Sequence, residues 1–335
     1  MDRIAGLKDY IQKSEFKEAL GIPQEDKIES KLLAQGEYNI NYVFIHPVSK
    51  KKLILRVNTG SQMHLEDQIQ YEYHALKLLE GSGRTPRAVY VDGDKKQLEY
   101  GIMVMEFLEG HALDYRREMS YAAQCLADIH SVSVDSDSGL IMPEDPLQAI
   151  LDECNEMVKT YYASSLGEVH KKRMIERMLK RGQQMLDNVP VYEGYRCCIN
   201  TELNSGNFLI NGEGKDNYLV DWEKPLYGDP VQDLGHFLAP TTTFWKTDVI
   251  LGQEEMDDFV RQYKLYAAGR YDTEGIEERL RLFIPITCLR GITWCAMAWV
   301  QYQDPGRLIR NEETFYKMEA YLEEGFLERI EEEFL

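Results

Sequence analysis

The order of strand-like and helix-like segments in the first third of the chain limits the fold more than any other feature of the sequence. Residues 31–58 consist of short β-rich runs, with a glycine turn at Gly36 and a polar turn in HPVSKKK. Residues 66–80 then place apolar side chains at helical intervals, and the β-rich runs AVYVDG and YGIMVMEFL follow. An amphipathic pattern at residues 5–20 predicts a helix before the strands. This order predicts a small antiparallel sheet accompanied by helices.

The rest of the chain is predicted to be mostly helical. One strand–turn–strand interrupts it at 207–221, where NFLINGEGKDNYLVD places Asn-Gly and Gly-Lys-Asp between two apolar runs. A single hydrophobic core stops growing at about 250 to 300 residues. A chain of 335 residues therefore favours two packed lobes. We expect an α+β fold with a small N-terminal antiparallel β-sheet lobe at 1–108 and a larger, mostly helical C-terminal lobe at 109–335.

Acidic residues are concentrated in the second of these lobes. Residues 1–108 contain 15 Lys and Arg against 16 Asp and Glu, whereas residues 109–335 contain 23 against 41. The second lobe thus carries 18 of the 19 net negative charges. A field of this sign repels nucleic acid and anionic membranes and attracts cationic molecules. An acidic surface that only keeps the protein in solution has the same composition, so both interpretations stay open.

The sequence shows no pattern typical of secretion or membrane insertion. The segment MDRIAGLKDYIQKSEF alternates charged and apolar residues, and no run of about 18 apolar residues stands out. The six cysteines form no CxxC pair and have no nearby histidine at zinc-ligand spacing. We therefore expect free, buried thiols rather than disulfides or a structural metal, and a cytoplasmic location.

Residues 197–237 combine the side chains that phosphoryl transfer requires. The reaction needs a carboxylate beside the attacking hydroxyl, an Asn and an Asp to hold Mg²⁺, and a cation on the nucleotide phosphates. In kinase-type sites the carboxylate residue precedes the metal-binding Asn by five positions, and the metal-binding Asp ends a short hairpin. Glu202, Asn207 and Asp221 have this spacing. They are the candidate catalytic residues, with Asn207 and Asp221 as metal ligands.

This segment resembles the aminoglycoside phosphotransferase and choline kinase superfamily. The family signature is HxDxxxxN, an apolar strand, DWE or DxE, and GDPxxDL; this chain has NTELNSGN, FLI, DWE and GDPVQDL. The resemblance covers about residues 30–305 and implies a bilobal protein-kinase-like fold, with ATP as phosphoryl donor and Mg²⁺ as its metal ion. It also implies that Asp229 and Asp233 brace the catalytic loop and that His130 is a structural hydrogen-bonding residue.

The resemblance extends into the N-terminal lobe. GEYNINYVF is similar to the family's phosphate-covering turn, Arg56 occupies the place of the strand lysine that contacts phosphates, and VMEFLEG resembles the hinge that holds adenine through backbone groups. Glu72 on the following helix is then the ion-pair partner of Arg56. The implied nucleotide-binding residues are Gly36, Asn39, Arg56, Glu72, Glu106 and Leu108. A surface turn or salt bridge explains each one alone, and their order along the chain favours the site.

Two loop residues depart from the signature. Asn200 replaces the histidine, and its amide can make one or two of the same hydrogen bonds. Glu202 replaces the aspartate and moves the carboxylate by about one bond length. Such a displacement matters, because misplacing a catalytic group by about 1 Å can lower the rate on the order of a hundredfold. A glutamate, with an ordinary pKa of about 4.3 against about 3.9 for aspartate, still accepts a proton. We predict an active kinase, and the alternative is a catalytically inactive nucleotide-binding module with a signalling or scaffold role.

The acceptor is predicted to bind the helical lobe. RGITWCAMAWVQYQ resembles the choline and ethanolamine kinase helix WxxWxxxQ, with Met297 in place of the second Trp. Aromatic rings hold an ammonium group by cation–π attraction of roughly 0.5 to 2 kcal/mol per ring. The implied acceptor-binding residues are Trp245, Trp294, Trp299 and Tyr302. They indicate a cationic hydroxyl compound such as an amino alcohol, amino sugar or aminoglycoside-like molecule, unless these rings only pack in the core. A protein-serine kinase is disfavoured, because HRD, DFG and APE strings are lacking.

Overall fold

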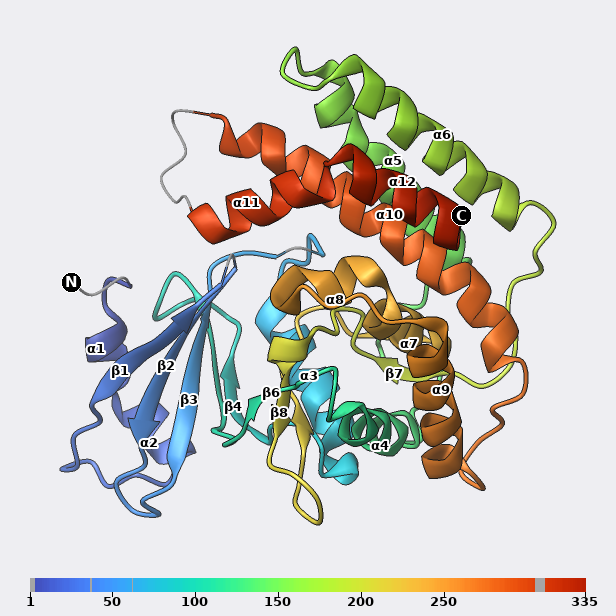
Figure 1. The fold of residues 1–335 in the computed structure, drawn as a ribbon. Coiled ribbons are helices and arrows are strands. Elements are labelled where there is room, and N and C mark those ends of the chain that lie inside the picture. Colours follow the sequence, from blue (N-terminus) through green and yellow to red (C-terminus); the bar gives the residue numbers. More distant parts are fainter. Residues whose placement is uncertain (1–3, 37, 62, 305–310) are drawn as a thin grey trace.

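The structure is a computed structural model that describes residues 4–36, 38–61, 63–304 and 311–335. The first part of the chain forms a five-stranded antiparallel sheet with the strand order β1-β2-β3-β5-β4 (Figure 1). Its elements are α1 Leu7–Tyr10, α2 Ser14–Ala19, β1 Ser30–Gln35, β2 Asn39–Ile45, β3 Lys52–Asn58, α3 Gln68–Leu79, η1 Glu80–Ser82, β4 Ala88–Asp92 and β5 Gly101–Glu106. The predicted sheet, with a helix between its third and fourth strands, is confirmed.

The remainder is mostly helical, and Figure 1 shows its helices gathered beside and above the sheet. Its elements are β6 His111–Ala112, α4 Met119–His130, α5 Pro146–Ala163, α6 Val169–Leu186, β7 Cys197–Ile199, η2 Ser205–Asn207, β8 Phe208–Ile210, β9 Tyr218–Leu219, β10 Leu226–Gly228, α7 Pro230–Leu238, α8 Pro240–Thr247, α9 Gln253–Ala267, α10 Ile276–Tyr302, α11 Glu312–Tyr321 and α12 Glu324–Phe334. Among these strands, β8 and β9 form the predicted hairpin. The α+β fold class is therefore confirmed.

Alternation along β3 decides which of its side chains reach the site. Leu53, Leu55 and Val57 are buried in the hydrophobic cluster that includes α1 and α2. Because successive side chains of a strand point to opposite faces, Arg56 lies on the other face. There its guanidinium meets Glu72 of α3. The alternation of the sequence thus places Arg56 on the face where it pairs with Glu72.

The N-terminal segment differs from its prediction. Instead of one helix over residues 5–20, the chain forms α1 and α2 with a turn between them. In a continuous helix, Tyr10 and Phe16 would lie about 9 Å apart along the axis and on different faces. The turn brings their ring centroids to 5.4 Å in an edge-to-face contact, and both rings are buried. Burial of both aromatic rings against the sheet therefore outweighs the helical pattern.

Helix α10 is the central helix of the second part. Its 27 residues contain an 18-residue window with a mean hydropathy of 1.4, so by length and composition it qualifies as a membrane span, contrary to the expectation from sequence. However, 67% of that window is buried inside the molecule. Its buried side chains pack against α5, α6 and α12 in one hydrophobic cluster. The helix is accounted for as a core helix.

The hydrophobic core does not stop at residue 108. One cluster joins Ile69, Leu76 and Met103 of the first part to Leu126 and Phe237 of the second. Helix α3 and the inner face of β5 are therefore packed into the helical part as well as against their own sheet. A boundary between lobes near residue 108 stays a prediction. The packing indicates that the two parts fold as one unit.

Candidate active site

The loop between β7 and β8 is anchored by the buried carboxylate of Asp233. Asp233, which is fully buried, accepts hydrogen bonds from the backbone N–H groups of Asn200 at 2.8 Å and Thr201 at 2.7 Å. On its other side, His130 Nε2 lies 3.1 Å from the same carboxylate. Thr201 has a φ of 68°, which is unusual for a β-branched residue. The two N–H bonds hold the loop in that strained conformation.

Asn200 joins this loop to the hairpin that follows it. Its side-chain amide donates to the backbone oxygen of Asp221 at 2.8 Å, and its side-chain oxygen accepts from the Glu202 N–H at 3.0 Å. Asp221 also has a positive φ, of 67°. The residue that replaces the signature histidine therefore fixes the spacing between the backbones of Glu202 and Asp221.

The β8–β9 hairpin brings Asn207 beside the segment that ends in Asp221. Phe208 pairs with Leu219, and the Val220 N–H donates to the Asn207 backbone oxygen at 2.8 Å. The Asn207 side-chain N–H donates to the Glu202 backbone oxygen at 2.8 Å. In the described part of the chain, nothing donates to Asn207 Oδ1. The amide is thus oriented with its oxygen available.

This donor set fits Mg²⁺. The ion prefers oxygen ligands and is usually bound by one or two carboxylates together with substrate phosphates and water. The Asp221 side chain is 36% exposed and makes only long contacts, with its Oδ1 3.4 Å from Arg56 Nη2. Within residues 4–36, 38–61, 63–304 and 311–335, no group of three His, Cys, Asp or Glu could hold a metal by itself. Phosphate oxygens would have to complete a Mg²⁺ site here.

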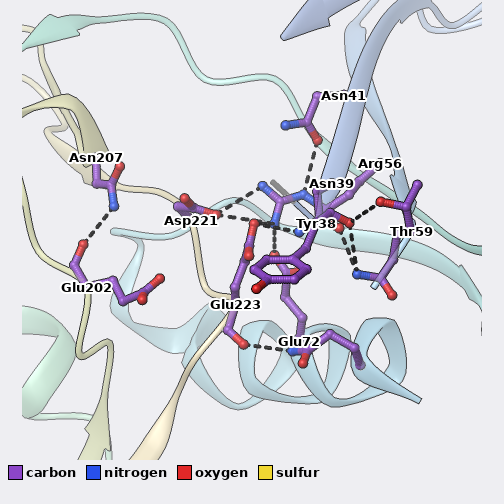
Figure 2. Close-up of polar contacts among 12 residues, drawn as sticks. Tyr38, Asn39, Asn41, Arg56, Thr59, Glu72, Glu202, Asn207, Asp221 and Glu223 are labelled. Carbon is purple, nitrogen blue, oxygen red and sulfur yellow. Dashed lines mark hydrogen bonds and ion pairs between the residues drawn. The ribbon is translucent and has the colours of Figure 1, made fainter. Parts of the chain in front are cut away.

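Arg56 is surrounded by three carboxylates (Figure 2). Its guanidinium forms an ion pair with Glu72 and lies within 3.9 Å of Glu223 and 3.4 Å of Asp221. Its Nε also donates to Asn41 Oδ1 at 3.1 Å. Burial and the nearby Asp221 raise the pKa of Glu223 to about 8, and burial raises the pKa of Glu72 despite the attraction of Arg56. Three carboxylates thus share one guanidinium, and the proton that Glu223 retains near neutral pH limits their mutual repulsion.

In the turn predicted to cover the phosphates, the Asn39 side chain is bonded within the protein. The Asn39 amide donates to Glu223 Oε1 at 2.5 Å and accepts from Asn58 Nδ2 at 3.0 Å, so both ends of the amide are bonded within the protein. At Gly36, a Cβ would meet the Asn39 backbone oxygen at an ordinary 3.7 Å. The protein itself therefore does not require glycine there. Phosphate contact by either residue stays a prediction.

The predicted hinge lies where β5 ends. Glu106 pairs with Leu53 of β3, and its N–H donates to the Arg87 backbone oxygen at 2.9 Å. The Phe107 N–H points to the Lys52 oxygen at 3.4 Å, and Leu108 follows as the chain leaves the sheet. The structure thus gives this segment a fixed backbone beside the sheet. Adenine binding by Glu106 and Leu108 stays a prediction.

Glu202 lies in a cluster of four charged side chains that the sequence did not predict. Its Oε1 is 3.8 Å from Lys224 Nζ and 3.9 Å from Arg290 Nη2. Arg290 Nε donates to Glu153 Oε2 at 2.8 Å, and Lys224 Nζ is 3.9 Å from Glu153 Oε1. In Figure 2 the Glu202 carboxylate points away from the Asn207 amide. The Glu202 carboxylate therefore lies beside two cations and not beside the Asn207 amide.

Burial and charge oppose each other in this cluster. Burial raises the pKa of Glu202, and Lys224 and Arg290 offset only part of that rise. Burial alone would also raise the pKa of Glu153, but Arg290 and Lys224 outweigh it, so that this pKa lies below its ordinary value. For Lys224, burial and the charge of Arg290 lower the pKa, against the attraction of the two glutamates. Each charge in the cluster therefore depends on its partners.

Two of these residues were within reach of sequence reasoning. Lys224 directly follows the DWE tripeptide, and Arg290 stands four positions before Trp294, on the same face of α10. No sequence motif linked Glu153 on α5 to the loop that contains Glu202.

The four aromatic residues predicted to bind the acceptor lie in or against one hydrophobic cluster, and acceptor binding by them stays a prediction. The Trp245 and Trp294 rings meet edge to face at 5.4 Å, and both side chains are partly exposed. The Trp299 ring instead lies edge to face against the Tyr161 ring, with 6.2 Å between their centroids. The Tyr302 side chain is buried, with 7% exposure. Five positions along a helix rotate a side chain by about 140°. This rotation keeps the rings of Trp294 and Trp299 apart, whereas the rings of Trp245 and Trp294 are in direct contact.

Comparison with known proteins agrees with this geometry. The family described as the phosphotransferase enzyme family (APH) matches residues 29–275. Comparison with curated proteins gives no match. A spectinomycin phosphotransferase solved with ADP and spectinomycin has 12% identity and a TM-score of 0.65, covering 92% of this chain and 93% of that one. Plasmodium vivax ethanolamine kinase has 14% identity and a TM-score of 0.63, covering 98% of this chain and 91% of that one.

Choline kinase from Cryptosporidium parvum is similar to the same degree, with 12% identity, a TM-score of 0.64 and coverage of 98% of this chain and 95% of that one. At such identities the structural likeness establishes the kinase-like fold alone. The family match spans well over half of the 335 residues. The superfamily inferred from NTELNSGN, DWE and GDPVQDL is thereby confirmed, and this chain belongs to the APH phosphotransferase enzyme family.

Proposed function

We propose that this protein is an ATP- and Mg²⁺-dependent kinase that phosphorylates a hydroxyl group of a small molecule in the cytoplasm. The observation that carries the proposal is the joint placement of Asn207, Asp221 and Glu202 by Asn200 and the β8–β9 hairpin. Members of the same fold were solved with ADP or with AMP-PNP and Ca²⁺. Those ligands support a nucleotide bound between the sheet and the predicted catalytic loop.

The residues of the chain divide the work as follows. Arg56, fixed by Glu72, provides a permanent positive charge for nucleotide phosphates. Asn207 and Asp221 would hold Mg²⁺. When bound, the ion neutralises negative charge on the nucleotide phosphates. Glu202 orients the acceptor hydroxyl and takes its proton as that oxygen attacks the γ-phosphorus. Because the transition state of phosphoryl transfer is loose, a carboxylate one methylene longer than aspartate is sufficient.

For the acceptor, the sequence favours a cationic hydroxyl compound, and two features support a site in the helical part. Trp245 and Trp294 form a partly exposed aromatic pair, and Arg290 on the same face of α10 as Trp294 reaches the catalytic loop. An amino alcohol, amino sugar or aminoglycoside-like molecule would place its ammonium group on these rings. The surrounding charge of the second part adds a weak, general attraction.

One observation favours the alternative, a nucleotide-binding module without catalysis. The Glu202 carboxylate is engaged by Lys224 and Arg290 rather than turned to Asn207. In an active enzyme this carboxylate must be able to face the acceptor hydroxyl. The two functions therefore differ in what a change at Glu202 does to turnover.

The experiment is a screen of amino alcohols, amino sugars and aminoglycosides for nucleotide-dependent mass gain of one phosphoryl group, with the wild type, Glu202→Asp and Glu202→Gln. Catalysis predicts turnover in the wild type, retention or gain in Glu202→Asp and a loss of a hundredfold or so in Glu202→Gln. Binding of Mg-ATP without any mass gain in the three proteins would establish the module instead.

A further inference from the structure

Lys224 and Arg290 present hydrogen-bond donors that the protein leaves unused beside Glu202. Lys224 Nζ lies 3.8 Å from Glu202 Oε1 and 3.9 Å from Glu153 Oε1, beyond hydrogen-bond length. In the described ranges of the chain, the Lys224 ammonium makes no closer contact with an acceptor, and Arg290 makes one, through Nε to Glu153. These side chains are only 15% and 18% exposed. Nearly buried charged donors require acceptors.

The unused donors face the acceptor side of the site. Arg290 and Trp294 are four residues apart on α10, with Met297 and Gln301 continuing the same face. Trp294 and Met297 are partly exposed and Gln301 is exposed, so this face runs from the catalytic loop to solvent. The nucleotide-side cation, Arg56, belongs to a separate cluster with Glu72, Asp221 and Glu223.

The cluster of two carboxylates and two cations is neutral before the reaction, and one cation loses its partner during it. Glu153 contacts Arg290 directly and neutralises it. The nearest carboxylate to Lys224 is Glu202, which gives up its negative charge when it accepts the hydroxyl proton. An acceptor carrying only an ammonium group at this end would meet Lys224 and Arg290 as like charges. An acceptor carrying an anionic group would supply both the missing hydrogen-bond acceptors and the missing charge.

We propose that Lys224 and Arg290 form an anion subsite beside Glu202, and that the acceptor is a hydroxy compound with a carboxylate or phosphate group next to its reacting hydroxyl. This deepens the proposed kinase function and rests on it. In the reaction the hydroxyl oxygen bonds to the γ-phosphorus, the bond from that phosphorus to the β–γ bridging oxygen breaks, ADP leaves and the proton passes to Glu202. The anionic group stays bound and unchanged. An ammonium group elsewhere on the acceptor remains compatible with the Trp245–Trp294 pair.

Matched compounds that differ in one charged group test the proposal. The pairs are ethanolamine and serine, glycerol and glycerate, and glycerol and glycerol 3-phosphate, each with Mg-ATP and radiolabelled γ-phosphate. We expect the anionic member of a pair to react with at least tenfold higher kcat/KM, and the second and third pairs separate a carboxylate from a phosphate. Equal or faster reaction of ethanolamine or glycerol would overturn the anion subsite while leaving the kinase function intact.

Variants identify the residues. Lys224→Gln and Arg290→Gln should raise KM for the anionic compound tenfold or more and leave KM for ATP within about twofold, and Lys224→Arg should restore most of the affinity. Lys215→Gln, which removes an exposed charge from the β8–β9 turn, is the control. Thermal melts exclude unfolding as the cause. Unchanged KM in folded Lys224→Gln and Arg290→Gln would refute the assignment.

Binding without turnover separates the two proposals. If no compound is phosphorylated, the kinase proposal fails, and the subsite is then judged by calorimetric titration of glycerate and of glycerol 3-phosphate into protein saturated with Mg-AMP-PNP. Binding in the wild type that weakens at least tenfold in Lys224→Gln, but not in Lys215→Gln, upholds the subsite. No detectable binding of either anion overturns it.

Discussion

Arg56 illustrates how one buried side chain balances the charge of the carboxylates around it. It is 5% exposed and its partner Glu72 is 1% exposed, so both charges depend on each other for compensation. Glu72 Oε2 has no hydrogen-bond partner in the described part of the chain. Removing one member of a buried ion pair leaves an uncompensated charge. The cost of such a change is therefore much larger than the net value of the pair.

We expect Arg56→Met to lower the free energy of unfolding by about 3 to 5 kcal/mol, because Glu72 would be left buried and unpaired. The same variant should weaken binding of ATP, as it removes the phosphate-facing cation. Urea unfolding and nucleotide titration measure the two effects. Lys159→Met is the matched control, since its ion pair with Glu156 on α5 is solvent-exposed and should contribute less than about 0.5 kcal/mol. A similar loss in both variants would contradict the argument.

Asn200 gives a second prediction at the scale of single residues. Asn200→Ala removes the acceptor of the Glu202 N–H and the donor to the Asp221 oxygen, so we expect a loss of about 1 to 3 kcal/mol of stability. Turnover should fall on the order of tenfold or more, because the base and metal positions lose their common spacer. Asn200→His, the residue of the signature, should retain activity better. An inactive Asn200→His beside an active Asn200→Ala would exclude this spacer role.

At the scale of elements, α7 supports the catalytic loop through an uncharged histidine. His236 Nδ1 donates to the Leu203 backbone oxygen at 2.9 Å, which places a proton on Nδ1. Burial, with a smaller contribution from Arg290, lowers the pKa of His236 from 6.5 to about 4. As the pH falls below about 6.5, His236 therefore becomes protonated in the unfolded chain but stays neutral in the folded chain. Stability contributed by neutral His236 is complete above that pH and is lost as the pH approaches 4.

This linkage predicts that lowering the pH from 7.5 to 5 costs the wild type up to about 2 kcal/mol more than it costs His236→Asn. Asparagine keeps a donor for the Leu203 oxygen and does not titrate. Urea unfolding of both proteins at the two pH values gives the difference, and carboxylates that titrate in both proteins cancel. Parallel loss of stability in the two proteins would rule out His236 as the titrating group.

Elements whose pattern is local were predictable from sequence. β3 and α3 follow from alternation and helical spacing, and the order of the signature residues identified the loop, the hairpin and the family. The charged cluster at Glu202 was not predictable, because its members come from α5, the catalytic loop, the segment after β9 and α10. The contacts among these four side chains depend on how the helices pack against one another, and a local sequence pattern does not predict that packing. The contact of Trp299 was not predictable for a related reason: helical rotation turns its ring towards Tyr161 and away from Trp294.

At the scale of the whole molecule, the continuous core decides how a bound ligand changes stability. Side chains of α3, β4 and β5 share one hydrophobic cluster with α4, α7 and α9. A nucleotide bound between sheet and catalytic loop therefore contacts parts that unfold together. We expect one cooperative thermal transition in the full chain, and no independent melting of residues 1–108.

Magnesium nucleotide should shift that single transition as a unit. At a hundredfold excess over Kd, a ligand that binds only the folded state stabilises it by about 2.7 kcal/mol, which scanning calorimetry with Mg-AMP-PNP detects as a rise in Tm. Asp221→Asn should lose the part of this rise that requires Mg²⁺, because it removes the one carboxylate proposed as a ligand. Glu213→Gln, in the exposed turn of the same hairpin, should behave like the wild type. If the Tm of Asp221→Asn still rises in full with Mg²⁺, that residue is not a metal ligand. If the calorimetric scan instead shows two separate transitions and the ligand shifts only one of them, the core does not couple the two lobes.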